Sequence, residues 1–274
     1  ANKTISDHFE RTGLLYSIDI SAASSEMIDN AMLDKIAALP GVESVSPNVD
    51  MWFFESVEYG DKAANSFQSR AQSANGTTKQ TIVAGRDLTE ADTGALVLVS
   101  KDIANVLTDD NPEALVNQEI ILATNDYYTG PGQKPENCDF QTGTCQSVNV
   151  TVTVVGINEG QRTLLFPLQF GIDQSTSTYY SPVPNCDGFV EQDNQRCANG
   201  YITNSSNMIL DNGYQSIRIR AQSDEVIAGI GAELVAQFDM RDQSDLETTG
   251  GDYYFVIGQD MLREALKAFR VVSL

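Results

Sequence analysis

The chain has 274 residues, 41% of them hydrophobic, which is enough apolar material for a packed core in one large domain or two ordinary ones. Its 38 acidic residues outnumber its 17 Lys and Arg residues, and the resulting net charge of -21 repels nucleic-acid phosphates and anionic lipid surfaces. We therefore expect no nucleic-acid partner. The sequence also lacks a run of about 18 apolar residues and a basic-then-apolar leader, so any membrane span is expected outside it.

The first forty residues have the pattern of helix, strand and helix. The spacing of apolar residues predicts a lead-in helix over residues 2–11 and a half-buried strand over 14–20. A second helix follows, with Ser24 or Ser25 as its N-cap and Pro40-Gly41 as its stop. The apolar stripe of this helix consists of Ile28, Met32, Ile36 and Leu39.

Extended sequence comes next. Alternation predicts a long strand over residues 49–59, and it favours a core role over a binding role for the aromatic run Trp52, Phe53 and Phe54. The polar, small-residue stretch of residues 60–80 predicts a long flexible loop or a hairpin tip, and a short strand is expected over 81–85.

A β-rich region begins near residue 95. Apolar runs predict strands at "ALVLVS", at "NQEIILA" and, most clearly, over Val148–Val154, where Gly156 is expected to end the strand. A short helix is expected over residues 102–107. We predict that residues 95–210 form an inserted second domain between a first segment, 1–94, and a last segment, 211–274.

The last segment repeats the opening pattern. Alternation at Ile217 and Ile219 predicts a strand, and Ser223 caps a helix whose stripe contains Ile227, Ile230, Leu234 and Phe238. "DYYFVIG" supplies another strand, and "DMLREALKAFRVVSL" has a helical pattern without a stop signal. Two related strand-helix units therefore flank the insertion, and we expect the chain to be a domain of a larger protein.

Four cysteines lie in polar, turn-rich sequence within the insertion, at Cys138, Cys145, Cys186 and Cys197. Their spacing favours two local disulfides, Cys138 with Cys145 and Cys186 with Cys197, each worth about 2 to 3 kcal/mol, and hence an oxidising compartment. A zinc site or free buried thiols are the alternatives, but no Cys-x-x-Cys knuckle is present.

Motifs for catalysis or for a cofactor are lacking. The single histidine, His8, lies beside Asp7 and Glu10 without a nucleophile signature, and neither a phosphate-binding loop nor a dinucleotide fingerprint occurs. Asp187, Glu191 and Asp193 carry the oxygen ligands that suit calcium, but their spacing is typical of a solvated acidic loop. We therefore predict no catalytic residue, no metal and no cofactor.

The order of several segments resembles the extracytoplasmic core domain of MacB-type ABC transporter permeases, a superfamily that includes FtsX-like permeases. The segments are "LDKIAALPGVESVSPNV", "TIVAGRDL", "ALVLVSKDIANVL", "NQEIIL", "VTVTVVGI" and "YYFVIGQDMLREALKAFRVV". The resemblance implies an α+β fold, with a porter-like lobe of two βαβ-type units formed by both ends of the chain and an inserted β-rich lobe.

The resemblance also implies a function without catalysis. Such a domain lies outside the membrane, in a permease homodimer or heterodimer whose cytoplasmic ATPase drives export or extraction of substrate. An extracytoplasmic adaptor or substrate-binding protein is a further implied partner. The four cysteines and the polar loops of residues 131–207 depart from the family pattern. Three other functions remain open: a freestanding secreted binding module, an FtsX-like regulator of a cell-wall hydrolase, and a hydrolase without histidine.

Overall fold

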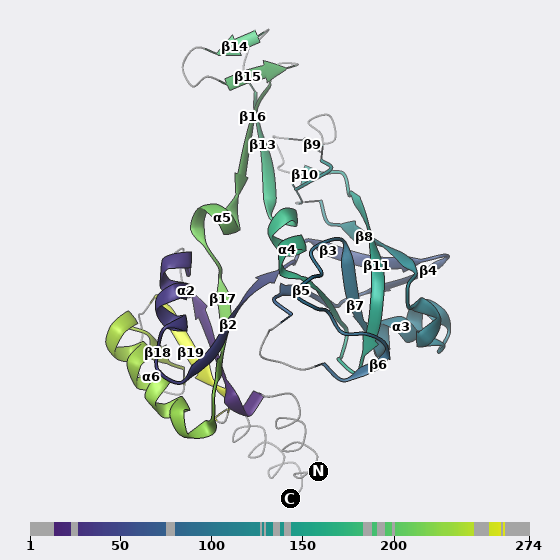
Figure 1. The fold of residues 1–274 in the computed structure, drawn as a ribbon. Helices are drawn as coiled ribbons and strands as arrows, with labels where there is room; N and C mark the ends of the chain where they lie inside the picture. The colour runs from purple at the N-terminus through teal and green to yellow at the C-terminus, as the bar shows by residue number, and fades with distance from the viewer. Residues whose placement is uncertain are drawn as a thin grey trace, which may run out of the picture. The chain divides into compact units, whose positions relative to one another are not determined.

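The computed structural model of the chain divides into two units (Figure 1). It describes residues 14–22, 27–74, 80–126, 128, 130–133, 138–139, 144–182, 188–190, 195–198, 201–243, 252–258 and 260. Unit 1 comprises the described residues of Ala1–Val49, Gln72–Thr81 and Asn212–Leu274, and unit 2 comprises those of Asp50–Ala71 and Ile82–Asp211. Unit 1 is therefore built from both ends of the chain, and most of unit 2 is inserted between them.

Unit 1 is a split βαβ sheet. Its strands follow the order β18-β19-β1-β17-β2, in which β1 pairs antiparallel with both β17 and β19, and β17 pairs antiparallel with β2. The elements are η1 (Leu14–Tyr16), β1 (Ser17–Ala22), α2 (Asn30–Ala37), β2 (Val42–Asp50), β17 (Ser216–Ala221), α6 (Asp224–Phe238), β18 (Arg241–Asp242) and β19 (Tyr253–Ile257). The two strand-helix units predicted from the sequence thus interleave in one sheet.

The core of unit 1 lies on one face of this sheet. Register places Ile18 beside Ile219 and Ile20 beside Ile217, and none of these four side chains is exposed. Helix α6 packs on the same face, because Gly231 lies against the side chains of Phe255 and Ile257, which pair with Ile20 and Ile18. On the other face, Arg218 donates hydrogen bonds to both carboxylate oxygens of Asp19.

Unit 2 is β-rich. Its main sheet has the order β5-β12-β7-β11-β8-β3-β4, with β6 also paired to β11, and the ribbons β9-β10 and β13-β16-β15-β14 are separate sheets. The main-sheet elements and helices are β3 (Phe54–Tyr59), β4 (Lys62–Asn65), β5 (Gln68–Gln72), β6 (Ile82–Gly85), β7 (Leu96–Ser100), α3 (Lys101–Thr108), η2 (Pro112–Leu115), β8 (Glu119–Thr124), β11 (Asn149–Asn158), β12 (Thr163–Pro167), α4 (Leu168–Gln174) and α5 (Met208–Asn212). The ribbons contain β9 (Cys138–Asp139), β10 (Thr144–Cys145), β13 (Thr176–Pro182), β14 (Gly188–Val190), β15 (Gln195–Ala198) and β16 (Tyr201–Asn207).

Strand β11 is the centre of the main sheet. It pairs with β8 and β6 along one edge and with β7, in parallel, along the other. The prediction that Gly156 ends this strand is wrong, because the strand continues to Asn158 through a register shift at Gly156. A Cβ at Gly156 would lie 2.2 Å from the carbonyl oxygen of Arg86, so glycine allows the neighbouring backbone to approach the bulge.

The base of the β13-β16 ribbon is fastened by Asn207. Its Nδ2 donates to the carbonyl oxygen of Ile172 (2.7 Å) and to Oγ1 of Thr176 (2.8 Å), and its Oδ1 accepts from the backbone N–H groups of Ile209 and Leu210 (both 3.1 Å). One amide therefore joins the end of α4, the start of β13 and the first turn of α5.

Two predictions near the N-terminus are wrong in detail. Leu14–Tyr16 form a 3-10 turn, closed by a hydrogen bond from Ser17 Oγ to the Leu14 carbonyl (2.8 Å), and the strand begins only at Ser17. Helix α2 begins at Asn30, with Asp29 as its N-cap, because Ile28 instead exchanges backbone hydrogen bonds with Tyr214 (2.8 and 2.9 Å). Residues 2–11, 23–26 and 261–274, which carried other helix predictions, lie outside the described residues.

The predicted long strand over residues 49–59 is two strands, since a turn at Met51–Phe53 separates β2 from β3. For residues 60–80 the prediction left a long loop and a hairpin tip open, and the structure has a hairpin at the start of this segment: β3 and β4 pair around Gly60, whose φ of 60° suits the turn. Strand β5 follows, so the long-loop alternative is wrong for the first part of the segment. The two units also divide the chain elsewhere than at the predicted residues 94 and 95, because the β3–β6 segments pair within the sheet of unit 2.

Candidate functional site: an aromatic pocket in unit 2

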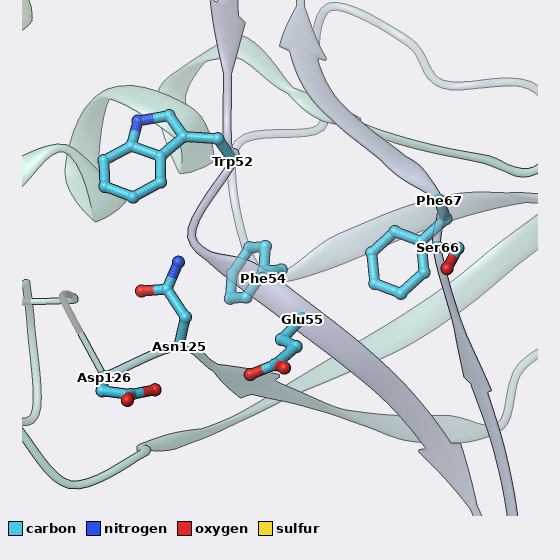
Figure 2. A pocket seen from close by; sticks show the side chains of 7 residues that line it. All are labelled: Trp52, Phe54, Glu55, Ser66, Phe67, Asn125 and Asp126. Atoms are coloured by element: carbon cyan, nitrogen blue, oxygen red, sulfur yellow. The ribbon is translucent and has the colours of Figure 1, made fainter.

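A pocket of ≈ 430 Å³ lies in unit 2, and Figure 2 shows its lining. Three segments that are distant in sequence provide the walls: the turn before β3 with the start of that strand, the β4-β5 connection, and the residues that follow β8. The lining residues are Trp52, Phe54, Glu55, Ser66, Phe67, Asn125 and Asp126. This volume is within the range of small-molecule sites.

The first wall is a tight turn that separates neighbouring aromatic side chains. Phe54 N–H donates to the Met51 carbonyl (3.3 Å), and Met51 N–H donates to the Ser69 carbonyl (2.9 Å). The turn leaves Phe53 and Phe54 only 7% and 5% exposed, whereas Trp52 is 67% exposed. The sequence prediction of a core role is therefore confirmed for the two phenylalanines and wrong for Trp52.

The second wall is the short connection between β4 and β5, and Arg162 holds it. The Arg162 guanidinium donates to the carbonyl oxygens of Ser66 (2.8 Å) and Asn65, and Gln68 N–H donates to the Arg162 carbonyl (2.9 Å). Both Ser66 (φ 60°) and Arg162 (φ 43°) have left-handed backbone conformations, which cost energy for residues other than glycine. These hydrogen bonds offset that cost and fix the position of Phe67.

The third wall is attached to the first by a backbone hydrogen bond. Asn125 N–H donates to the Phe53 carbonyl (2.8 Å), and the Asn125 carbonyl accepts from Tyr128 N–H (3.2 Å). The Asp126 carbonyl in turn accepts from Cys145 N–H (2.5 Å), which connects this wall to the β9-β10 ribbon. Backbone hydrogen bonds thus anchor each of the three walls to a neighbouring segment.

A chain of aromatic rings lies behind the pocket. Phe53 contacts Phe54 (ring centroids 4.8 Å apart) and Tyr128 (4.9 Å), and Phe54 lies 6.0 Å from Phe166. Tyr128 is buried and its hydroxyl donates to Gln174 Oε1 (2.8 Å), and burial raises the pKa of this hydroxyl. These rings form a buried apolar cluster behind Phe54, which itself lines the pocket.

The pocket has a negative electrostatic character. Glu55 and Asp126 are exposed carboxylates, and the seven lining residues include no Lys, Arg or His. Arg162 lies behind the second wall, but its guanidinium donates to backbone carbonyls there. The arrangement offers the exposed ring of Trp52, the partly exposed ring of Phe67, an amide and two carboxylates, with no nucleophile-base pair for catalysis among the lining residues.

The predicted site residues are placed only in part. Cys138 and Cys145 lie opposite each other in the β9-β10 register, and Cys145 is disulfide-bonded in the structure, so this pairing stays a supported prediction. Cys186, His8, Asp187, Glu191 and Asp193 lie outside the described residues, so the second disulfide and the calcium alternative remain untested. Among the residues that the structure describes, no group of three metal-ligating side chains occurs.

Sequence reasoning missed the pocket because its walls come from three separate segments. Glu55, Asn125 and Asp126 carry no motif, and only the aromatic run at Trp52 gave a signal. The turn that exposes Trp52 depends on Ser69, a residue from another strand, so strand alternation alone misassigned this side chain.

Comparison with known proteins places the fold. No family model and no curated protein matches the sequence. The periplasmic region of MacB from Actinobacillus actinomycetemcomitans has a similar structure, with a TM-score of 0.54 and 12% identity over 96% of this chain and 98% of that one. The extracellular domain of the ABC-type transporter YknZ from Gram-positive bacteria aligns with a TM-score of 0.48 and 14% identity over 87% and 98% of the two chains.

The chain therefore has the α+β fold of the MacB periplasmic region, as the resemblance in the sequence predicted. None of the helices in the described part of the chain is long and apolar enough to cross a membrane.

Proposed function

We propose that this chain is the extracytoplasmic domain of a MacB-type ABC transporter permease. In this role the domain catalyses no reaction and couples ATP hydrolysis by a cytoplasmic subunit to export or extraction of a substrate outside the membrane. The fold shared with the MacB periplasmic region supports the proposal, and so does the pocket, whose side chains are suited to binding and lack a catalytic pair.

One observation carries the proposal: both ends of the described fold meet at one place in unit 1. A Cβ on Gly258, just after β19, would lie 1.8 Å from the carbonyl oxygen of Leu14, the first described residue, and Ile18 pairs with Ile257. In a domain inserted between two membrane helices, the points where the chain enters and leaves the fold need to lie side by side. Movements of two such helices would act on adjacent strands of a single sheet.

The proposal assigns partners and a location. The partners are a cytoplasmic ATPase, a second permease subunit and an extracytoplasmic adaptor or substrate-binding protein. The location is the outer side of the cell membrane, where a disulfide in the β9-β10 ribbon would persist.

Labelling of the full gene product in its own cells tests the proposal. Ala236, an exposed residue of α6, is replaced by cysteine, and Ile230, a fully buried residue of the same helix, provides the matched control. We expect a membrane-impermeant maleimide to label A236C in intact cells, with the protein in the membrane fraction, and to leave I230C unlabelled. An ATPase subunit should copurify in detergent and hydrolyse ATP.

Two results would contradict this function. Labelling of A236C only after lysis would place the domain inside the cell. Recovery of the protein from the culture medium, without a membrane-bound form, would favour a secreted binding module.

A further inference from the structure

We propose that the aromatic pocket of unit 2 binds a small organic cation, with an alkylated ammonium group as its recognised part. This inference goes beyond the proposed transport role and does not depend on it. It rests on the seven residues that line the pocket.

The pocket exposes aromatic surface to solvent, most of all at Trp52. An indole that is 67% exposed keeps a large apolar area in water, although folding buries Phe53 and Phe54 beside it. Figure 2 shows the Trp52 and Phe67 rings on different sides of Phe54. Aromatic faces attract an organic cation within about 6 Å of the ring, and tryptophan attracts it most strongly.

The pocket and the chain as a whole carry negative charge. The carboxylates of Glu55 and Asp126 lie on the side of the pocket away from the Phe67 ring (Figure 2), and the chain as a whole carries a net charge of -21. Anions are repelled by both, whereas a cation is attracted over long range and then meets the two carboxylates. A neutral ligand gains no such attraction from the net charge of the chain or from the two carboxylates.

The type of cation follows from the lining. An inorganic ion would leave the aromatic rings unused, and no group of three metal-ligating side chains occurs among the described residues. An alkylated ammonium group is weakly hydrated and has an apolar surface, so it can contact the rings while its charge faces the carboxylates. The volume of ≈ 430 Å³ fits a small molecule.

The walls are also held in position before a ligand arrives. Hydrogen bonds from Asn125 N–H to the Phe53 carbonyl (2.8 Å) and from Arg162 Nε to the Ser66 carbonyl (2.8 Å) fix two walls against their neighbours. Binding therefore costs little ordering of the backbone.

Choline and its neutral carbon isostere, 3,3-dimethyl-1-butanol, form the matched pair of probes. We expect titration calorimetry or NMR with the full chain to show choline binding with a Kd below about 10 mM, as is reasonable for a ligand of this size. The alcohol should bind about tenfold more weakly or not at all, and choline binding should weaken as ionic strength rises.

Variants locate the site. Glu55→Gln and Trp52→Ala should each weaken choline binding by about three- to tenfold. Glu58→Gln, on the same strand but outside the lining, should leave the Kd unchanged. Circular dichroism and thermal unfolding verify that each variant is folded.

Four results would overturn the proposal. They are equal binding of choline and the alcohol, no choline binding at about 10 mM, an unchanged Kd in both pocket variants when they are folded, and binding of a lysine-containing peptide without binding of choline. The last result would identify a protein surface instead of a small-molecule site.

Discussion

Arg86 and Asp92 close the loop between β6 and β7 with a paired ionic contact. The guanidinium donates from Nη1 to Oδ2 (2.6 Å) and from Nη2 to Oδ1 (2.9 Å), and Thr89 donates to Oδ2 from its N–H (2.7 Å) and its hydroxyl (2.9 Å). Hydrogen bonding to Arg86, followed by the bonds from Thr89, lowers the pKa of Asp92 from 3.8 to about 2. The Asp92 side chain is 10% exposed, so solvent screens this pair only in part.

This carboxylate makes stability depend on pH. Because the pKa of Asp92 is lower in the folded chain, its contribution is present above the unfolded pKa near 4 and is lost as the pH falls toward 2. We expect Asp92→Asn to lower the free energy of unfolding at pH 7 by about 1 to 2 kcal/mol, a value discounted because Arg86 is 51% exposed, and to have a smaller effect at pH 2.

Denaturant unfolding of the variant and the parent across this pH range measures the effect. Arg86→Gln should cost a similar amount, and the double variant should cost less than the sum of the two. A cost for Asp92→Asn that does not change between pH 7 and pH 2 would contradict this assignment.

At the scale of elements, the β9-β10 ribbon is predicted to carry a structural disulfide. Cys138 and Cys145 are opposite each other in the ribbon, and Cys145 N–H donates to the Asp126 carbonyl in the pocket wall. We expect peptide mapping by mass spectrometry without reductant to find Cys138 linked to Cys145, and Cys145→Ser with Cys138→Ser to cost about 2 to 3 kcal/mol of stability. Four free thiols would refute both this pairing and the predicted pair of Cys186 and Cys197.

Helices and strands whose sequence pattern lies entirely within the element were predictable from the sequence. Strand β17 and helix α6 follow from alternation at Ile217 and Ile219 and from the apolar stripe after Ser223, and both elements contain the residues predicted for them. Elements that depend on distant partners were not predictable. Ile28 has a helical spacing, but its backbone bonds to Tyr214 keep it extended, and the turn that exposes Trp52 is fixed from Ser69.

At the scale of the whole molecule, each unit has its own apolar core. Ile219 in unit 1 and Leu98 in unit 2 are both fully buried, so replacing either by alanine should cost about 2 to 5 kcal/mol. Because Ile219 and Leu98 belong to the cores of different compact units, we expect each substitution to accelerate native-state hydrogen exchange mainly in its own unit. Equal acceleration in both units after either substitution would show that they unfold as one cooperative body.

The pairing of β1 with β17 and β19 also dictates an order of events at the ribosome. Asp19 and Arg218, partners across β1 and β17, are 199 residues apart in sequence. While unit 2 is being synthesised, both edges of β1 lack partners, and Ile18 and Ile20 have no sheet to pack in. A nascent chain released before Ile257 leaves that apolar strand open to chaperones and proteases. Strand β1 therefore becomes fully paired only after β19 has been synthesised.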